Sequence, residues 1–208
     1  MKRGRFLTLE GLDGAGKSTQ LAFVHAWLAE RGVDAVFTRE PGGTKIGEQL
    51  RSLLLSVDTD VSLDTETLMM FAARNEHIEQ VIEPALEGGR WVVCDRFTDT
   101  TYAYQGGGRG VSAERIAVLE DWVQQGLHPD LTLLFDLSPE VAAARMAKER
   151  ELDRFEREAS EFHQRVRAAY LARAEAHPNR YAIFDASKPV AEIQQLLAAR
   201  LQQLLESA

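Results

Sequence analysis

The sequence has one cysteine in 208 residues and no long apolar segment. A single thiol, Cys94, cannot form an internal disulfide, so nothing indicates an oxidising compartment. No stretch approaches the roughly 18 consecutive apolar residues of a membrane span, and no apolar signal-like region opens the chain. We therefore expect a cytoplasmic protein with no membrane partner.

The chain also has fewer basic than acidic residues, with 24 Lys and Arg against 32 Asp and Glu, which gives a net charge of −8. Sequence-independent binding of duplex nucleic acid depends on a basic surface, so the composition predicts no nucleic-acid partner and disfavours a nucleic-acid ATPase. A small phosphorylated ligand needs only a few local cations. The positions of the arginines therefore matter more than their number.

Apolar runs of strand length alternate with segments of helical period. Continuous apolar strands separated by helices predict a parallel sheet covered on both faces, and no linker or repeat divides residues 1–208, so we expect a single α/β domain. Helical stripes lie at 66–86 and 112–126, the second with Ser112 as its cap, and a third runs from Ile193 to Leu205. The five predicted strands are 6–9, 33–37, 91–94, 131–135 and 181–184.

A glycine-rich loop follows the first predicted strand. Its sequence, GLDGAGKS at 11–18, fits G-x-x-x-x-G-K-[ST] and precedes a helical segment. Loop N–H groups and the helix N-terminus bind phosphate oxygens, Lys17 reaches the β- and γ-phosphates, and the Ser18 hydroxyl is a Mg²⁺ ligand. The predicted ATP-binding residues are Gly11, Leu12, Asp13, Gly14, Ala15, Gly16, Lys17, Ser18 and Thr19.

Asparagine is nearly absent, which narrows the class of nucleotide-binding protein. Neither Asn75 nor Asn179 lies in the Asn-Lys-x-Asp motif that a GTPase uses to read guanine. Three arginines suggest a second anion site instead: Arg39 and Arg96 follow predicted strands, where ligands of open parallel sheets bind, and Arg74 lies in a helix. A second phosphorylated nucleotide is the expected acceptor.

The surroundings of these arginines add detail to the expected site. Phe71 and Arg74 share a helix face, where a ring and a guanidinium can hold a nucleobase, although Phe71 also fits the core stripe. Asp95 beside Arg96 at a strand end suits a Mg²⁺ ligand next to a phosphate-binding cation. QGGGRG at 105–110 has little side-chain mass and is predicted to be a flexible loop near the ligand.

With these motifs together, the chain resembles the thymidylate kinases over nearly its whole length. The resemblance rests on LEGLDGAGKST, TREPGGT, FAAR, DRFTDTTYAYQGGGRG, PDLTLLFDL and LDRFE. It implies a P-loop NTPase fold of the nucleoside monophosphate kinase type: a five-stranded parallel sheet flanked by helices, with a helical lid at about 145–160. It also implies phosphorylation of dTMP to dTDP with ATP and Mg²⁺, and a homodimer.

The resemblance assigns roles to individual residues. Asp13 resembles the carboxylate near the acceptor and the metal, and Asp95 joins Ser18 at the metal. Arg96, helped by Arg39, is expected to bind the acceptor phosphate. The residues expected around the thymidine part of the acceptor are Phe71 as the stacking ring, Arg74 as a donor to a base carbonyl, Thr100 and Thr101 on the base, Tyr104 against the 2′ side of the sugar, and Gln105 at the mouth.

The catalytic cation is expected in the lid. Gly14 follows Asp13, so the arginine that some family members carry in the phosphate loop is absent. The charged segment at 145–167 offers Arg145, Lys148, Arg150 and Arg154, of which we favour Arg150 and then Lys148. Two alternatives stay open: a related nucleotide or nucleoside kinase with another acceptor, and a non-catalytic nucleotide-binding regulator.

Overall fold

The structure is a computed structural model that describes residues 3–58, 60–146, 153–156 and 158–207. All five predicted strands form and pair in parallel in one sheet, in the order β2-β3-β1-β4-β5. Only β2 begins two residues later than predicted. The strands are β1 (Phe6–Glu10), β2 (Ala35–Arg39), β3 (Trp91–Asp95), β4 (Leu131–Asp136) and β5 (Tyr181–Asp185).

The central strand β1 is buried along its whole length because β3 and β4 pair with it on either side and helices cover both faces. Its register sets Leu9 against Asp95 of β3 and against Leu133 of β4. The phosphate loop therefore leaves the sheet at its centre, beside the end of β3. The order of the strands runs in opposite directions on the two sides of β1. Ligands of open parallel sheets bind at such a switch point.

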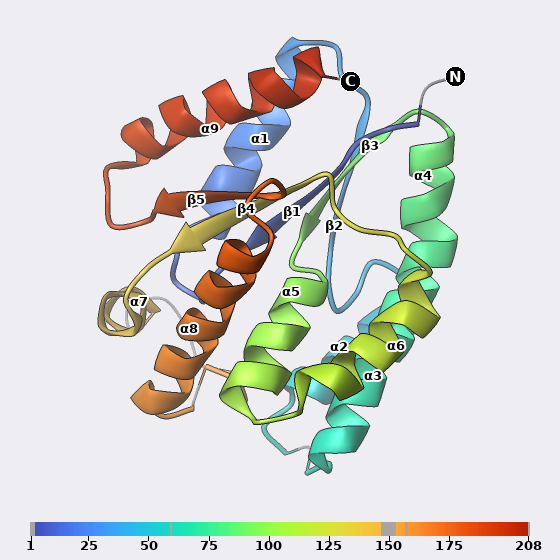
Figure 1. Cartoon of the computed structure of the whole chain (residues 1–208), viewed down its shortest axis with the longest axis vertical. Helices are drawn as coiled ribbons and strands as arrows, with labels where there is room; N and C mark the ends of the chain where they lie inside the picture. Colours follow the sequence, from blue (N-terminus) through green and yellow to red (C-terminus); the bar gives the residue numbers. More distant parts are fainter. Residues whose placement is uncertain (1–2, 59, 147–152, 157, 208) are drawn as a thin grey trace.

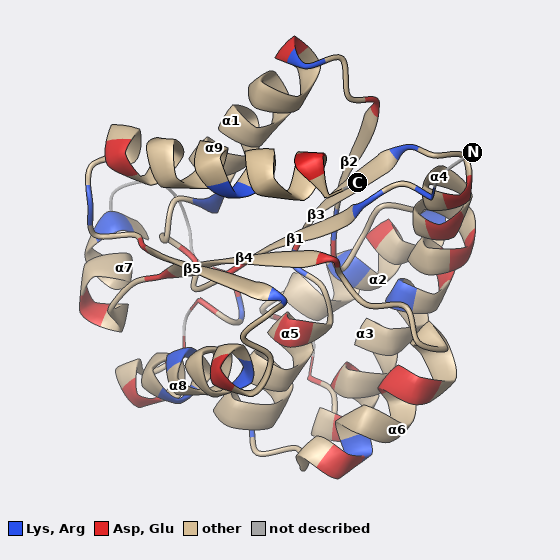
Figure 2. Cartoon of the chain, turned by 45° about the horizontal axis from the view of Figure 1, so that its top comes forward, with Lys and Arg blue, Asp and Glu red and all other residues tan. Residues whose placement is uncertain are grey.

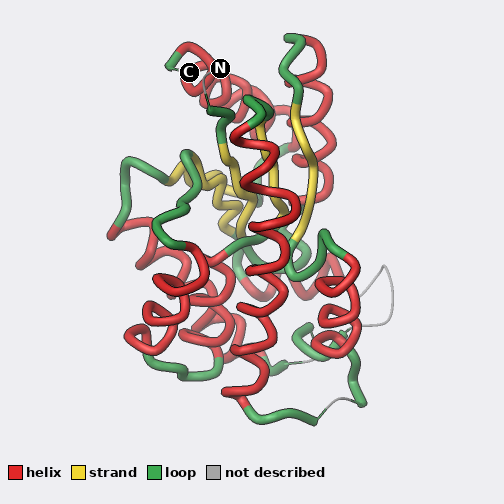
Figure 3. Tube along the Cα trace, turned by 90° about the vertical axis from the view of Figure 1, so that its right-hand side faces the viewer, coloured by secondary structure: helices red, strands yellow, loops and turns green. Residues whose placement is uncertain are grey.

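Helices form a layer on each face of the sheet. Figures 1 and 2 place α1 (Lys17–Glu30) and α9 (Val190–Glu206) on one face, and α5 (Thr98–Thr101) and α8 (Ser160–Ala176) on the other. In Figure 3 the strands occupy the upper half of the molecule, and a group of helices extends beyond them in the lower half. The remaining helices are α2 (Lys45–Leu55), α3 (Leu63–His77), α4 (Glu83–Glu87), α6 (Ala113–Gln124) and α7 (Pro139–Met146).

All three predicted helical stripes are confirmed, and the third, from Ile193 to Leu205, lies within α9. The stripe at 66–86 becomes α3, a π-helical turn η1 (Ile78–Ile82) and α4 in direct succession. Ser112 caps α6 by accepting a hydrogen bond from the backbone N–H of Arg115. Across the described residues, no helix combines the length and apolar character needed to cross a bilayer.

The prediction of a flexible loop at 105–110 is wrong. Residues Tyr102–Gly108 form a π-helical segment, η2, which continues α5. A Cβ on Gly107 would lie 2.6 Å from the Ala169 Cβ, and one on Gly108 would lie 2.4 Å from the Phe162 ring. The glycines thus let η2 pack directly on α8, a tertiary reason for their presence that local propensity does not reveal.

A buried ionic cluster connects α5 to α8 and to the residue just before β5. Asp99 is 1% exposed and accepts hydrogen bonds from Arg173 Nε at 2.6 Å and from both terminal nitrogens of Arg180, at 2.6 and 3.0 Å. Burial alone would raise the pKa of Asp99, but the two guanidinium groups outweigh it and hold the pKa below its ordinary value. Asp99 is therefore ionised at neutral pH.

Replacing Asp99 with Ala should lower the free energy of unfolding by about 3 kcal/mol, because two guanidinium groups lose their buried counter-ion. A carboxyl whose pKa is lowered by folding stabilises above its ordinary pKa of about 3.9 and loses that effect as the pH falls. The gap between wild type and variant should therefore narrow below about pH 4. Chemical denaturation at several pH values measures it.

Asp34→Ala is the matched control, because Asp34 also pairs with an arginine, Arg90, at 3.0 Å, but on the surface. Exposed pairs contribute little to stability, so this variant should lose far less than Asp99→Ala. Equal losses in the two variants would contradict a stabilising role for the buried cluster.

Candidate active site

The phosphate loop connects β1 to α1. Gly11, Gly14 and Gly16 all have positive φ, at 136°, 78° and 83°. A side chain on Gly11 would clash with the backbone of Phe135 at 2.4 Å, so the tight path of the loop requires glycine there. The loop thus wraps over the N-terminus of α1, where N–H groups and the helix dipole favour anions.

Lys17 is buried within this loop. Its Nζ donates to the carbonyls of Gly11 and Leu12 at 3.1 and 3.0 Å and lies 3.7 Å from Asp13 Oδ1. Burial, reinforced by the nearby charge of Arg96, lowers the pKa of Lys17. The loop carbonyls therefore hold the ammonium group against the phosphate loop, and its predicted contact with the β- and γ-phosphates stays a prediction.

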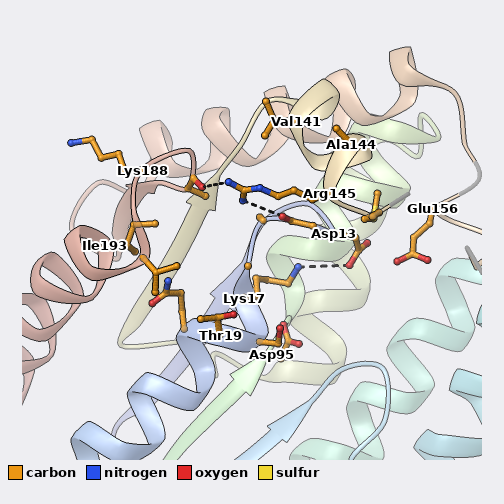
Figure 4. Close-up of a pocket in the computed structure, with 18 residues that line it drawn as sticks. Asp13, Lys17, Thr19, Asp95, Val141, Ala144, Arg145, Glu156, Lys188 and Ile193 are labelled. Carbon is orange, nitrogen blue, oxygen red and sulfur yellow. Dashed lines mark hydrogen bonds and ion pairs between the residues drawn. The ribbon is translucent and has the colours of Figure 1, made fainter. Parts of the chain in front are cut away.

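A cavity of about 710 Å³ opens over the loop. All of the loop from Asp13 to Thr19 lines it, and Figure 4 shows Lys17 and Asp13 on one side and Arg145 above them. Arg145, from α7, donates to the carbonyls of Gly14 and Ala186, at 3.4 and 3.1 Å. The other wall comes from the region of β5 and α9, with Lys188, Val190 and Ile193.

Ser18 and Asp95 line the same cavity, and Asp95 Oδ1 is buried without a hydrogen-bond partner among the described residues. A buried, unpartnered carboxylate oxygen is costly unless a ligand satisfies it. The described residues contain no group of three or more His, Cys, Asp or Glu side chains arranged so that they could hold a metal ion by themselves. One carboxylate and one hydroxyl fit Mg²⁺, which usually takes its other ligands from phosphates and water.

A second cavity adjoins the first. A hollow of about 100 Å³ is lined by Asp13, Arg51, Arg96 and Tyr104, and a smaller one beside it by Arg74 and Thr101. The two hollows share Arg96 and Thr100. Asp13 and Glu156 line both the larger hollow and the cavity over the phosphate loop. The two binding spaces therefore meet at Asp13.

Arg96 stands between the two spaces. Its Nη2 donates to Asp13 Oδ1 at 2.6 Å, and its Nη1 lies 3.3 Å from Thr100 Oγ1 and 3.2 Å from the Tyr170 hydroxyl. Burial would lower the pKa of Arg96, but Asp13 and other acidic neighbours raise it well above its ordinary value. Burial would likewise raise the pKa of Asp13, but Arg96 and Lys17 bring it below its usual range. Both groups are charged.

Arg74 lies at the far end of the second space and is 2% exposed. Its Nε donates to Glu40 Oε2 at 2.8 Å, and its Nη2 donates to Thr101 Oγ1 at 3.1 Å. Glu40 also binds His77 Nδ1, at 2.9 Å. The remaining nitrogen, Arg74 Nη1, is buried without a partner among the described residues, so it is free to donate to a ligand.

Phe71 does not reach either cavity. Its ring packs with Val111 and Ile116, and the Arg74 guanidinium lies 4.7 Å from the ring centroid. Met70 lines both hollows of the second space instead. Consecutive residues of an α-helix point about 100° apart, so Met70 faces the cavity while its neighbour Phe71 faces the core. The spacing of Arg74 from Met70, four residues, was the signal that sequence reasoning missed.

The remaining predicted acceptor residues divide into two groups. Thr100, Thr101 and Tyr104 line the second space, and the Tyr104 hydroxyl donates to Asp13 Oδ2 at 3.1 Å. Gln105 is fully buried and donates to Glu66 Oε1 at 2.9 Å, so it does not lie at a mouth. Its Oε1 has no partner among the described residues.

Arg39 also lies elsewhere than expected. It ends β2, pairs with Glu48 at 2.9 Å on the surface, and lines neither cavity. Arg51 of α2 occupies the second space instead and donates to the Pro41 carbonyl at 2.9 Å. No local pattern pointed to Arg51, because it reaches the second space from α2 through the fold rather than from a strand end.

The favoured lid cations, Lys148 and Arg150, lie outside the described residues. The other two candidates are described. Arg145 lines the cavity over the phosphate loop, whereas Arg154 donates to the Leu54 carbonyl at 3.0 Å and to Glu66 Oε2 at 2.5 Å. Arg154 is thus engaged with α2 and α3, away from the phosphate loop.

The chain is similar to known proteins over nearly its whole length. A sequence model described as thymidylate kinase matches residues 9–197. A thymidylate kinase of Chromobacterium violaceum is 65% identical over 206 residues, 99% of this chain and 97% of that protein, and one of Bordetella petrii is 61% identical over 204 residues, 98% of each.

A solved structure is also similar. The crystal structure of a thymidylate kinase from Ehrlichia chaffeensis superposes with a TM-score of 0.79 at 33% identity, covering 96% of this chain and 99% of that one. Two adjoining cavities, a phosphate loop and full-length similarity lead to one conclusion: the chain belongs to the thymidylate kinase family.

Proposed function

We propose that the protein transfers the γ-phosphoryl group of ATP to the phosphate of dTMP, giving ADP and dTDP. The observation that carries this proposal is the meeting of two binding spaces at Asp13, one over the phosphate loop and one lined by arginines. A nucleotide-binding regulator needs the first space only. A phosphotransferase with a phosphate acceptor needs both.

The chain's own groups position and neutralise two polyanions. Lys17 and the loop N–H groups bind the β- and γ-phosphates of ATP, and Arg96 and Arg51 bind the acceptor phosphate. That phosphate is already ionised at neutral pH, so the transfer requires no general base. Catalysis then consists of alignment and of stabilising the charge on the transferring group. Asp13 holds Arg96 where the two cavities meet and so keeps the two binding sites correctly placed relative to each other.

Mg²⁺ would be held by Ser18 and by Asp95, whose buried oxygen lacks another partner. When bound, the ion neutralises charge on the phosphates of ATP. We expect the lid to supply a further cation, from Arg150 or Lys148, because Gly14 stands where some family members carry an arginine in the phosphate loop.

For the nucleobase, the free Nη1 of Arg74 would donate to a thymine carbonyl, and Met70 would contact the face of the base. Burial of Arg74 makes this contact selective, because a base without an acceptor at that position would leave the donor unsatisfied. Tyr104, held against Asp13, would lie on the 2′ side of the sugar.

We also propose that the protein is a homodimer through α3 and α6. Leu68, Val118 and Trp122 are exposed on these helices, Trp122 to 74%. Beside them lies a hollow of about 280 Å³, with Asp64 and Arg115 paired at its rim. An exposed apolar patch with a polar rim that carries both charges suits an isologous contact with a second copy.

The acceptor is tested by a coupled assay for ADP release with ATP and Mg²⁺. We expect strong turnover with dTMP, weaker turnover with dUMP, since one methyl group contributes only about 1–3 kcal/mol in an apolar pocket, and almost none with UMP. Turnover with CMP, GMP or thymidine instead would show a related kinase with another acceptor. ATP binding without turnover on any acceptor would favour the regulator.

Replacing Arg96 with Ala should lower kcat on the order of 10³-fold, because the acceptor phosphate loses its charge-stabilising partner. Binding of ATP, measured by calorimetry, should change little. Arg39→Ala is the matched control, since Arg39 lies outside both cavities, and it should keep kcat near the wild-type value. Near-normal turnover in Arg96→Ala would contradict the assigned role.

The dimer is tested by sedimentation of wild type and Trp122→Glu. The wild type should sediment at about twice 23.2 kDa and the variant, which places a charge in the apolar patch, near 23.2 kDa. Ser187→Glu, on an exposed loop far from α6 in sequence, serves as the control and should remain a dimer. A monomeric wild type at micromolar concentration would refute this interface.

A further inference from the structure

A buried carboxylate lies behind Arg96, and the proposed transfer makes no direct use of it. Glu10, the last residue of β1, is fully buried. Burial, together with the charge of Asp99, raises its pKa above the ordinary value for a glutamate. Burying a carboxyl group costs free energy unless hydrogen bonds compensate for it, so the partners of Glu10 indicate what the group does.

Three donors converge on Glu10. Its Oε1 accepts from the backbone N–H of Phe97 at 2.7 Å, and its Oε2 accepts from the hydroxyls of Thr100 and Tyr170 at 2.6 and 3.0 Å. These partners come from the turn after β3, from α5 and from α8. Glu10 thus joins three elements that are distant in the sequence.

The same partners surround Arg96. Phe97 is the next residue, and Arg96 itself has a φ of 69°, a left-handed conformation that a non-glycine residue rarely adopts. The Thr100 and Tyr170 hydroxyls both lie within 3.3 Å of Arg96 Nη1. Glu10 therefore fixes the backbone of the turn through one oxygen and the partners of the guanidinium through the other.

The direction of the hydrogen bonds strengthens this connection. A hydroxyl has one hydrogen and two lone pairs. When its hydrogen points to the Glu10 carboxylate, its lone pairs remain for the guanidinium, which only donates. The two hydroxyls also lie 2.7 Å apart, so one of them can donate to the other while that one donates to Glu10. In either arrangement both hydrogens are used within this group, and both hydroxyls accept from Arg96. Asp13 holds the other terminal nitrogen, Nη2, at 2.6 Å.

We propose that Glu10 and Tyr170 are positioning residues that aim the Arg96 guanidinium at the acceptor phosphate. Neither lines the cavity over the phosphate loop or the second space, so both act through Arg96. Tyr170 lies 74 residues from Arg96 in the sequence and is the contribution of α8 to the site. This inference rests on the proposed role of Arg96.

The test compares Tyr170→Phe and Glu10→Gln with wild type, by kcat and KM for ATP and dTMP. Misplacement of a catalytic group by about 1 Å costs on the order of 10²-fold, so we expect kcat to fall roughly 10- to 100-fold. Both KM values should stay within about threefold, because neither residue touches a nucleotide. Glu10→Gln keeps the shape of the side chain but replaces one acceptor oxygen with an NH2 donor. The hydroxyls facing that group would then accept a hydrogen bond from it instead of donating one.

Tyr102→Phe is the matched control, because it also removes a tyrosine hydroxyl bound to a carboxylate, Glu120 at 2.6 Å, but away from Arg96. It should keep kcat within about twofold. Thermal unfolding of both tyrosine variants separates a loss of stability from a loss of positioning. A kcat within twofold of wild type in Tyr170→Phe would overturn the proposal, whether or not Glu10→Gln folds.

A double-mutant cycle decides whether the effect passes through Arg96. In an Arg96→Ala background, or Arg96→Lys if the first is unstable, Tyr170→Phe should lower kcat by no more than about twofold. Independent, multiplying losses would overturn the proposal. Failure of the Arg96 variants themselves to lower kcat would instead refute the role of Arg96, so the two failures are distinguishable.

Discussion

The contact between Arg96 and Asp13 is the interaction on which the rest of the site depends. It joins the phosphate loop after β1 to the turn after β3, and so joins the two nucleotide spaces. Both partners are partly buried and charged, and each stabilises the ionised form of the other. Removing either one would leave the other as an unpaired charge that is partly shielded from water, which is costly. Register between β1 and β3 makes this meeting possible.

Charge is distributed unevenly between surface and interior. The chain has a net charge of −8, yet Lys17, Arg51, Arg74 and Arg96 gather at the carboxyl ends of the strands. Acidic side chains accompany these cations, among them the buried Glu10 and Glu40 and the partly exposed Asp13. The acids orient the guanidinium groups and leave selected nitrogens free, as at Arg74 Nη1. A polyanionic ligand therefore meets cations that are already aimed, so little reorganisation accompanies binding.

Sequence reasoning was accurate where local pattern and chemistry agree. The five strands, the parallel sheet, the phosphate loop and the cap at Ser112 all follow from apolar runs, glycine spacing and capping chemistry. It failed where packing decides. Phe71 and Met70 are both apolar and adjacent, and only the rotation of α3 shows which one faces the cavity. The glycines at 106–108 suggested mobility, although their small size serves close contact with α8.

By itself, then, the sequence determined the class of fold, the phosphate loop with Lys17, and the family, because these depend on residues that are neighbours along the chain. Only the tertiary structure decided that Arg51 rather than Arg39 lines the second space and that Gln105 is buried against Glu66. It alone also brought Glu10, Thr100 and Tyr170 around Arg96. Such groupings depend on strand register and helix rotation, which are set by long-range packing of the whole core, and no local pattern records them.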